Sequence, residues 1–191
     1  METSVINTSA NLELSVIIWN KLRILKWDDF KRKYDSNGRG SAIAAIGFES
    51  KPIIEHIKVG SSFKFKIKEM QLNTIFIPDF SWVIKNISKK NSALLLKHEQ
   101  GHFDLAEEIT RKTRLRTANS LRNRVFNVKG KNEYQAKKDS ILRAAKIRKK
   151  IEDELQNELK SQETEYDDKT NHGLITKYQK KYDKRFEKLR A

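Results

Sequence analysis

Two histidines four residues apart, with a glutamate beside the first, are the residues of this chain best suited to chemistry. His98, Glu99 and His102 fit the pattern H-E-x-x-H, which places two imidazoles and one carboxylate around a zinc ion. On a helix, residues four apart lie on one side, so both ring nitrogens can point at one metal. Glu99 lies about 100° further round, which suits a group that reaches a metal-bound water without binding the metal. The spacing predicts a zinc site with His98 and His102 as ligands and Glu99 as the general base.

The residues around the motif read as one helix, Asn91–Asn119, with few helix breakers and a helical apolar pattern. Asn91 or Ser92 can cap its start. The two histidines share a face with four apolar side chains, Leu94, Leu95, Leu105 and Ile109. Buried imidazoles need partners, and the alternative to a metal is a pair of core histidines hydrogen-bonded to backbone or carboxylates. Glycine inside a helix costs about 1 kcal/mol relative to alanine, so either another segment approaches closely at Gly101 or the glycine is merely tolerated.

A catalytic zinc ion usually has three protein ligands and one open position for water. The nearest acids, Asp104, Glu107 and Glu108, lie roughly 100–160° round the helix from the histidine pair, where they do not reach a metal held by that pair. No third histidine follows in the extended metzincin pattern either. The third ligand is therefore expected from a distant part of the chain.

His172 is the first choice for this ligand, because it lies in a polar, turn-forming stretch, Tyr166–Gly173. A loop of this kind can fold back and present a side chain to a distant helix. Asp167 and Asp168 are the next candidates, since zinc accepts carboxylate oxygen, or one of them can hold a ligating imidazole by its second nitrogen. The plain alternative is an ordinary helix–helix connection whose aspartates act as caps.

The first part of the chain is strand-rich and the second part is helical. The expected strands are Leu12–Ile18, Ser41–Phe48, Phe63–Ile67 and Asn73–Ile77. Turn signals lie at Asp35–Gly38 and Gly60–Ser62, and His56, in a further strand-like stretch at Pro52–Val59, is interpreted as structural or surface. After the motif helix we expect a turn at Phe126–Lys131, a long charged helix from Asn132 to Glu165 and a last helix at Leu174–Leu189. Strands over 12–78 and helices over 91–190 predict a single α+β domain spanning 1–191, with a small, mostly antiparallel sheet.

The composition narrows the classes of partner. The chain has 191 residues and a net charge of +15, from 40 Lys and Arg against 25 Asp and Glu. Basic and acidic residues alternate along the helices, as on solvated faces, and no nucleic-acid fingerprint is visible, so specific nucleic-acid binding is not expected. The chain has no cysteine, which excludes disulfides and thiolate zinc sites but leaves the compartment undecided. Neither a signal peptide nor a membrane span is visible, because Met1–Leu12 is polar and the apolar run Val16–Trp19 is too short.

Four stretches in a fixed order give the chain a family resemblance. They are Leu25–Phe30, Ile77–Val83, Leu96–Glu107 and Tyr166–Gly173. On these residues the chain resembles the bacterial domain-of-unknown-function 922 family of secreted zinc-dependent proteases. The resemblance implies a zincin-like metallopeptidase that uses Zn²⁺, with His98 and His102 as ligands, Glu99 as catalytic acid and base, and a peptide or protein substrate. Its Thr-x-His-Gly stretch strengthens His172 as the third ligand. It also implies a periplasmic or secreted protein, with a cytoplasmic one as the alternative.

The expected reaction is peptide-bond hydrolysis by a metal-activated water. The strand Asn73–Ile77 is a candidate edge for aligning an extended peptide, and Tyr166 or Tyr178 is a candidate oxyanion stabiliser. Trp27 and Trp82 are interpreted as core aromatics. Two other classes remain open: a non-catalytic binding protein on a zincin fold, and a basic protein that binds nucleic acid or another anionic polymer.

Overall fold

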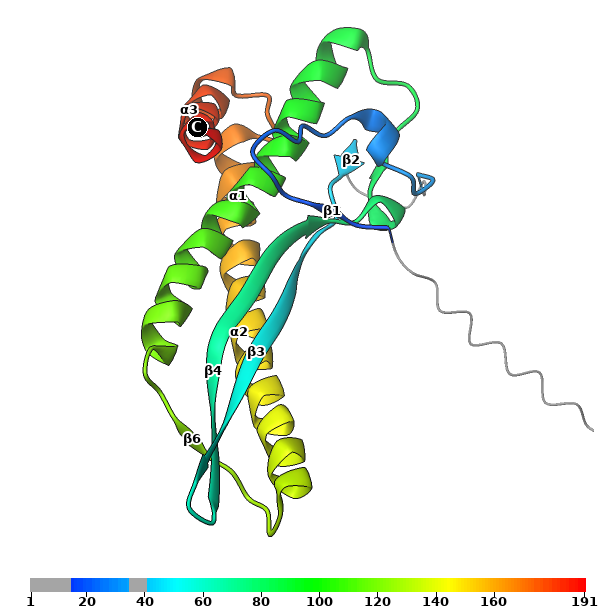
Figure 1. The fold of residues 1–191 in the computed structure, drawn as a ribbon. Helices are drawn as coiled ribbons and strands as arrows, with labels where there is room; N and C mark the ends of the chain where they lie inside the picture. Colours follow the sequence, from blue (N-terminus) through cyan, green and yellow to red (C-terminus); the bar gives the residue numbers. More distant parts are fainter. Residues whose placement is uncertain (1–14, 35–40) are drawn as a thin grey trace, which may run out of the picture.

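Antiparallel strands form two sheets in the described part of the chain, residues 15–34 and 41–191 of the computed structural model (Figure 1). In the larger sheet β4 lies between β3 and β1, and β6 also pairs with β4; the smaller sheet consists of β2 and β5. The strands are β1 (Ile17–Ile18), β2 (Ala42–Ile43), β3 (Ile46–Val59), β4 (Ser62–Phe76), β5 (Trp82–Val83) and β6 (Phe126–Asn127). The helices are α1 (Lys89–Leu121), α2 (Glu133–Thr170) and α3 (Thr176–Arg190), with short 3-10 helices at Trp27–Asp29 and Pro78–Phe80. The fold is mixed α+β with antiparallel sheets, as the sequence predicts.

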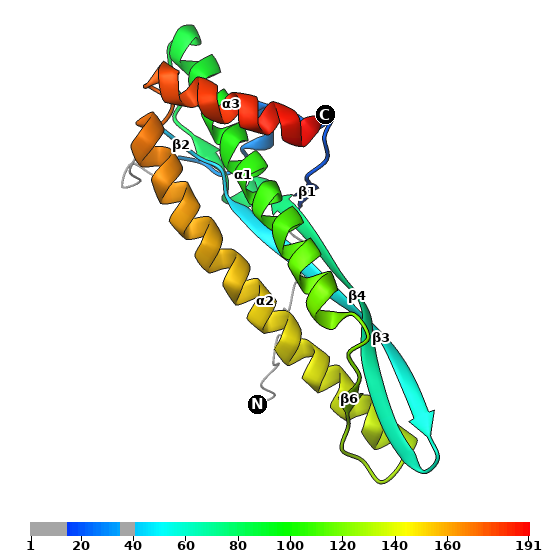
Figure 2. The ribbon, with the colours of Figure 1, turned by 90° about the vertical axis from the view of Figure 1, so that its left-hand side faces the viewer.

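The long hairpin of β3 and β4 gives the molecule its elongated shape, and α1 and α2 run antiparallel beside it (Figures 1 and 2). Helix α1 packs mainly on β4, and α2 packs mainly on β3. Helix α3 lies across the end where α1 begins and α2 ends (Figure 2). This arrangement brings the last turns of α2 beside the H-E-x-x-H motif. In the described residues no helix is long and apolar enough to cross a membrane.

Strand β4 differs from the sequence-based expectations in its length and in its edges. The stretch Phe63–Ile67 and all but the last residue of Asn73–Ile77 belong to one strand, β4. A β-bulge opposite Ile53 and Ile54 shifts the alternation of buried side chains part-way along it. Buried positions are odd before the bulge and, apart from Ile75, even after it, so the pattern reads as two strands. The strand is also interior at Ile75 and Phe76, which pair with β3 on one side and β1 on the other. The proposed substrate edge at Asn73–Ile77 is therefore wrong.

The remaining strand predictions are partly confirmed. The stretch Ser41–Phe48 splits into β2 and the start of β3, and Pro52–Val59 lies within β3. Of Leu12–Ile18, only the end is described and forms β1, whereas the turn Asp35–Gly38 lies outside the described residues. The predicted turn Phe126–Lys131 contains β6, whose Phe126 ring stacks on Phe65 at a centroid distance of 5.0 Å.

Both long helices extend beyond their predicted ends. Helix α1 begins after Ser88, whose Oγ accepts the Asn91 N–H, so neither Asn91 nor Ser92 is the cap. Helix α2 begins close to its predicted start, after the cap Asn132, but continues to Thr170. Polar composition suggested a loop there, but Tyr166 and Thr170 lie four residues apart and are both buried, so the helical core face continues. Two acids expected in a loop, Asp167 and Asp168, are thus held on a helix.

Aromatic side chains complete a second, smaller core where the N-terminal segment crosses α1. Its buried members include Trp19, Leu25, Phe30, Phe76 and Phe103. Trp82 is buried, and half-buried Trp27 packs edge-on against Phe30 at 4.9 Å. The interpretation of Trp27 and Trp82 as core aromatics is confirmed.

Arg190, near the end of α3, is expected to be a large contributor to stability. Its guanidinium contacts both carboxylate oxygens of Asp104, with Nε 2.9 Å from Oδ2, and the Asp104 side chain is only 4% exposed. Arg190→Met should cost about 3 kcal/mol of unfolding free energy, at the low end for a broken buried pair, because Trp19 Nε1 still donates to Asp104. Urea unfolding measures the loss. The control is Lys149→Met, which breaks an exposed pair with Asp153 and should cost less than about 1 kcal/mol. Equal losses would contradict this assignment.

Candidate metal centre

Helix α1 brings the ring nitrogens of His98 and His102 together, as their spacing predicts. Their Nε2 atoms lie 3.2 Å apart, and the two rings meet edge to face. The last turns of α2 add Asp167, whose Oδ1 lies 2.9 Å from His98 Nε2 and 3.0 Å from His102 Nε2. Ligand atoms of a tetrahedral zinc ion, each about 2.0–2.1 Å from the metal, stand roughly 3.3 Å apart. The three donor atoms therefore already have nearly the mutual separations that a zinc ion requires.

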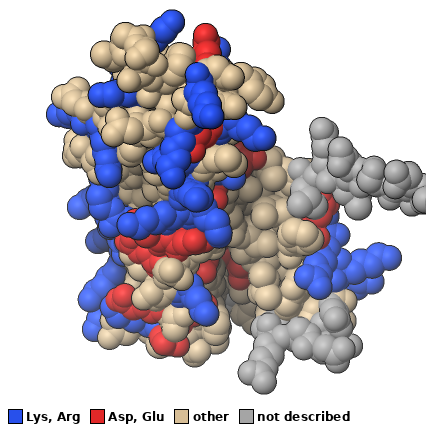
Figure 3. Space-filling model, turned by 90° about the horizontal axis from the view of Figure 1, so that it is seen from below, with Lys and Arg blue, Asp and Glu red and all other residues tan. Residues whose placement is uncertain are grey.

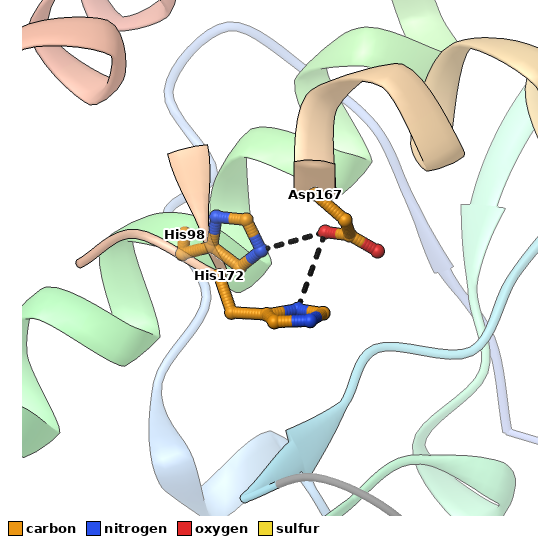
Figure 4. Close-up of side chains that lie close together, drawn as sticks. All are labelled: His98, Asp167 and His172. Carbon is orange, nitrogen blue, oxygen red and sulfur yellow. Dashed lines mark hydrogen bonds and ion pairs between the residues drawn. The ribbon is translucent and has the colours of Figure 1, made fainter. Parts of the chain in front are cut away.

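His172 lies on the open side of this group. It follows α2 in a turn where Asn171, His172 and Gly173 all have positive φ angles, of 46°, 52° and 83°. A histidine in the left-handed region costs roughly 1–2 kcal/mol, a strain that functional sites often contain. The ligand atoms of His98, Asp167 and His172 lie within 4.8 Å of one another (Figure 4). His172 Nδ1 is 3.6 Å from Asp167 Oδ1, and its side chain is 69% exposed.

Asp167 and Asp168, the two aspartates near the end of α2, point in different directions. Asp167 faces the histidines, whereas Asp168 is exposed on α2. Consecutive residues on a helix point about 100° apart, so α2 can direct only one of them at α1. The structure thus places Asp167, one of the two next candidates after His172, within 3.0 Å of both histidine nitrogens, and it does not bring Asp168 into the group.

Gln179 on α3 determines which nitrogen of His98 is free. Its Nε2 donates to the Tyr166 hydroxyl at 2.8 Å and to Asp183 Oδ1 at 3.0 Å, so its Oε1 faces His98 Nδ1 at 3.2 Å. An amide oxygen only accepts hydrogen bonds, so His98 Nδ1 carries the proton and Nε2 of the neutral ring has a lone pair. That lone pair faces a carboxylate oxygen, which is an unfavourable contact unless a proton or a cation lies between them. The donor set therefore fits a metal cation, and the side group that orients the ring is in place.

Glu163 faces the other ring nitrogen of His102 but lies beyond hydrogen-bond distance. It lies on α2 one turn before Asp167, and its Oε1 is 3.7 Å from His102 Nδ1, a buried nitrogen with no closer partner among the described residues. Burial raises the pKa of the Glu163 carboxyl. Burial lowers the pKa of His102, but its hydrogen bond to Asp167 and the charge of Glu99 outweigh this and raise it overall. Burial raises the pKa of Asp167, but the adjacent His102 and His98 side chains hold it well below its ordinary value.

Glu99 lies beside the histidines in the wall of a cleft of about 830 Å³. Burial raises the pKa of its carboxyl, although the two histidines and the Ala44 N–H partly offset this. The Ala44 N–H donates to Glu99 Oε2 at 2.8 Å and fixes its position. The cleft lies between β2, the start of α1 and the end of α2; its apolar lining comprises Ala42, Ile43, Ala44, Ile84, Ile87, Leu94, Leu95 and Leu174. An apolar wall next to a buried carboxylate and a group that could hold a metal ion is typical of a ligand-binding pocket.

Tyr166 supports the site from behind. Its ring stacks on His98 at a centroid distance of 4.6 Å, and its hydroxyl lies under α1, 3.3 Å from the His98 carbonyl oxygen. It is fully buried, and this burial raises its pKa. The hydroxyl does not face the cleft, so Tyr166 as oxyanion stabiliser is wrong. Tyr178 does not line the cleft either. Gly101 is not merely tolerated in the helix, because the Tyr166 side chain approaches it closely.

Gly101→Ala should therefore damage both stability and the site. A Cβ at Gly101 would lie 2.8 Å from Tyr166 Cζ and closer still to its hydroxyl oxygen. Overpacking of this kind costs about 1–3 kcal/mol, more than the roughly 1 kcal/mol that alanine gains in a helix. Thermal and urea unfolding measure the change. The matched background is Tyr166→Phe, in which Gly101→Ala should cost clearly less; an equal cost in both backgrounds would contradict the contact.

The acids that follow the motif point away from the histidines, in agreement with the helical count. Glu107 accepts from Thr74 Oγ1 at 2.9 Å, and Glu108 pairs with Arg185 and Lys112. His56 is exposed on β3, with Nε2 2.7 Å from Ser140 Oγ, and is structural as expected. Glu163 and Gln179 were missed. Glu163 lies four residues before Asp167, so a predicted helix that continued to Asp167 would have indicated it. The sequence contains no signal for Gln179.

Comparisons of the chain with protein-family models, with curated proteins and with solved structures found no match. The resemblance to the domain-of-unknown-function 922 family therefore rests on the four sequence stretches alone.

Proposed function

We propose that this chain is a zinc-dependent metallopeptidase of the zincin type. One observation carries the proposal: three donor atoms, His98 Nε2, His102 Nε2 and Asp167 Oδ1, lie 2.9–3.2 Å apart beside the buried Glu99. These three residues would hold the metal, with His172 as a fourth donor at the open side. A zinc ion bound there supplies a Lewis acid for the scissile carbonyl and a water with a pKa lowered toward about 7.

Glu99 is the proposed carrier of the proton. A general base works best when its pKa lies near the working pH, and burial moves the pKa of Glu99 in that direction. Its Oε2 is held by the Ala44 N–H, which leaves Oε1 for a water in the cleft. Glu99 takes the proton of the attacking water and passes it to the leaving amine. Gln179 and Glu163 orient the two imidazoles, and Tyr166 supports His98 from below.

Strand β2 replaces β4 as the candidate edge for substrate. Among the described residues it pairs only with β5, and Ser41 to Ala44 line the cleft. An extended peptide can form main-chain hydrogen bonds to such an edge. The apolar side chains of the cleft favour an aliphatic residue near the scissile bond. Export to the periplasm or outside the cell belongs to the same proposal through the family resemblance.

The experiment that tests the function has two parts. The purified chain, loaded with one equivalent of zinc, is incubated with a mixed peptide library, and cleavage is followed by mass spectrometry. Cleavage should stop on addition of a zinc chelator and return with added zinc. If the zinc-loaded chain cleaves no peptide, hydrolysis is rejected and the alternative of a non-catalytic binding protein is favoured. That alternative has one observation in its favour, namely that His172 offers a fourth donor that closes the site.

A further inference from the structure

Strand β4 is paired along the whole of one edge but only at the two ends of the other. On the second edge, Lys64 and Phe65 pair with β6, and Ile75 and Phe76 pair with β1. Within residues 15–34 and 41–191, no strand pairs with 66–73 on this edge. Unpaired main-chain groups of this kind are a template for another strand.

The direction of the backbone groups supports an accessible edge after the bulge. The Thr74 carbonyl accepts from the Trp19 N–H at 2.9 Å on this side. Backbone groups alternate between the two edges of a strand, so those of Leu72 and Met70 face the same way. The Leu72 carbonyl confirms this direction, because it accepts from Arg114 Nη2 at 2.7 Å, a bond that a docked strand would have to displace. The bulge, which leaves Lys68 unpaired with β3, limits regular new pairing to 69–73.

A cleft of about 790 Å³ follows this edge between β4 and the end of α1. Buried apolar side chains, including Met70, Leu72 and Leu121, line it. Its charged lining comprises four cations, Lys66, Lys68, Arg114 and Arg122, and one anion, Glu69. This excess is larger than that of the chain, with 40 basic and 25 acidic residues. Elsewhere, as on the hairpin end of the molecule, basic and acidic side chains are interspersed (Figure 3).

The metal-centre cleft has the opposite character. Glu99, Glu163 and Asp167 line it, and its lining contains no lysine or arginine among the residues whose side chains the structure describes. The two clefts share no lining residue. An anionic segment would therefore be attracted to the β4 cleft, a surface separate from the proposed active site.

We propose that the open edge of β4 is a docking site for an extended acidic segment of a partner protein. The segment would add a short strand alongside 69–73, with apolar side chains toward Met70 and Leu72 and carboxylates toward Lys68 and Arg122. Main-chain hydrogen bonds would provide affinity. Lys68 and Arg122 would select acidic sequences, since Lys66 already pairs with Glu55 and Arg114 with Glu107. A second copy of the chain is a poor occupant, because edges rich in lysine and arginine on chains of charge +15 repel each other.

Binding of synthetic peptides to the intact chain tests this site. The probe is a fluorescent peptide of about eight residues, long enough for one short strand, in which glutamate alternates with valine. Its matched partner has lysine in place of glutamate, and a third peptide has N-methyl groups on alternate amides, which remove main-chain donors. Fluorescence anisotropy should show binding of the first peptide and at least about tenfold weaker binding of the other two.

Charge-reversal variants locate the binding surface. The double variant Lys68→Glu, Arg122→Glu should weaken binding of the acidic peptide at least about tenfold. The control, Lys149→Glu, Lys150→Glu, makes the same charge change at two exposed positions on α2 and should leave the affinity nearly unchanged. Equal weakening in both variants, equal binding of the N-methylated peptide, or no binding of the acidic peptide would each overturn the proposal. Zinc content should be the same in both variants, so this result is independent of the proposed catalysis.

Discussion

Glu99→Gln is expected to lower peptide hydrolysis by about 10²–10⁴-fold, the usual contribution of a general acid–base group. Glutamine has the same shape and keeps an oxygen to accept the Ala44 N–H, now 2.8 Å from Oε2. The cleft and the histidines should therefore stay in place. What disappears is the group that takes a proton from the attacking water. The measurement is the rate of cleavage of a peptide identified in the library, alongside the zinc content of the same preparation.

The matched control for this experiment is Glu163→Gln. It makes the same substitution at a second carboxylate of the same cleft, one that faces His102 Nδ1 at 3.7 Å instead of the open space. Loss of such an orienting group typically costs 10–100-fold in metal affinity or activity, so its activity should recover at higher zinc concentration. The activity of Glu99→Gln should not recover. A fully active, zinc-loaded Glu99→Gln variant would refute the role of Glu99 as base.

The half of the site that lies on α1 was predictable because it depends on local periodicity alone. His98, Glu99 and His102 are within five residues of one another, and helical geometry fixes their relative directions. The same geometry excluded Asp104, Glu107 and Glu108, which the structure indeed places against other partners. Long helices with buried faces leave this periodic signal in the sequence.

The half that lies on α2 and α3 was not predictable in the same way, because tertiary packing decides it. The residues after Glu165 are polar enough to read as a loop, yet burial of Tyr166 against Gly101 extends α2 to Thr170. This extension turns Asp167 toward the histidines. Gln179 contacts His98 from another helix, and no spacing in the sequence links the two. Similarly, the bulge in β4 changes the alternation of buried side chains, so one long strand reads as two in the sequence.

His98 and His102 would fill two of the four coordination positions of a zinc ion. Whether a position stays open for water depends on how Asp167 and His172 fill the other two. Asp167 Oδ1 lies within 3.0 Å of both histidine nitrogens from a helix. His172 stands further off, on a left-handed turn, with most of its side chain in solvent. A helix holds a ligand more firmly than an exposed turn does. We therefore expect three firm ligands and one that can leave, which gives the open position that catalysis requires.

Asp167→Ala is accordingly expected to lower zinc affinity by at least about 100-fold, beyond the loss typical of a group that only orients a ligand. His172→Ala should lower it by about tenfold or less. Asp168→Ala is the matched control, since it removes the neighbouring, exposed carboxylate, and its affinity should not change. Competition with a coloured zinc chelator measures all three affinities. The absorption spectrum of bound Co²⁺ separately reports whether the coordination number changes.

The three variants also decide between the catalytic and the non-catalytic alternatives. If His172→Ala releases zinc and Asp167→Ala retains it, His172 is the third ligand and Asp167 only orients the imidazoles. If both variants lose zinc to the same extent, the site has four equivalent ligands and no position for water, so the metal is structural. A large loss for Asp167→Ala alone would leave His172 as a displaceable group. In that case the strained turn at Asn171–Gly173 holds a side chain that must move aside before a peptide carbonyl can approach.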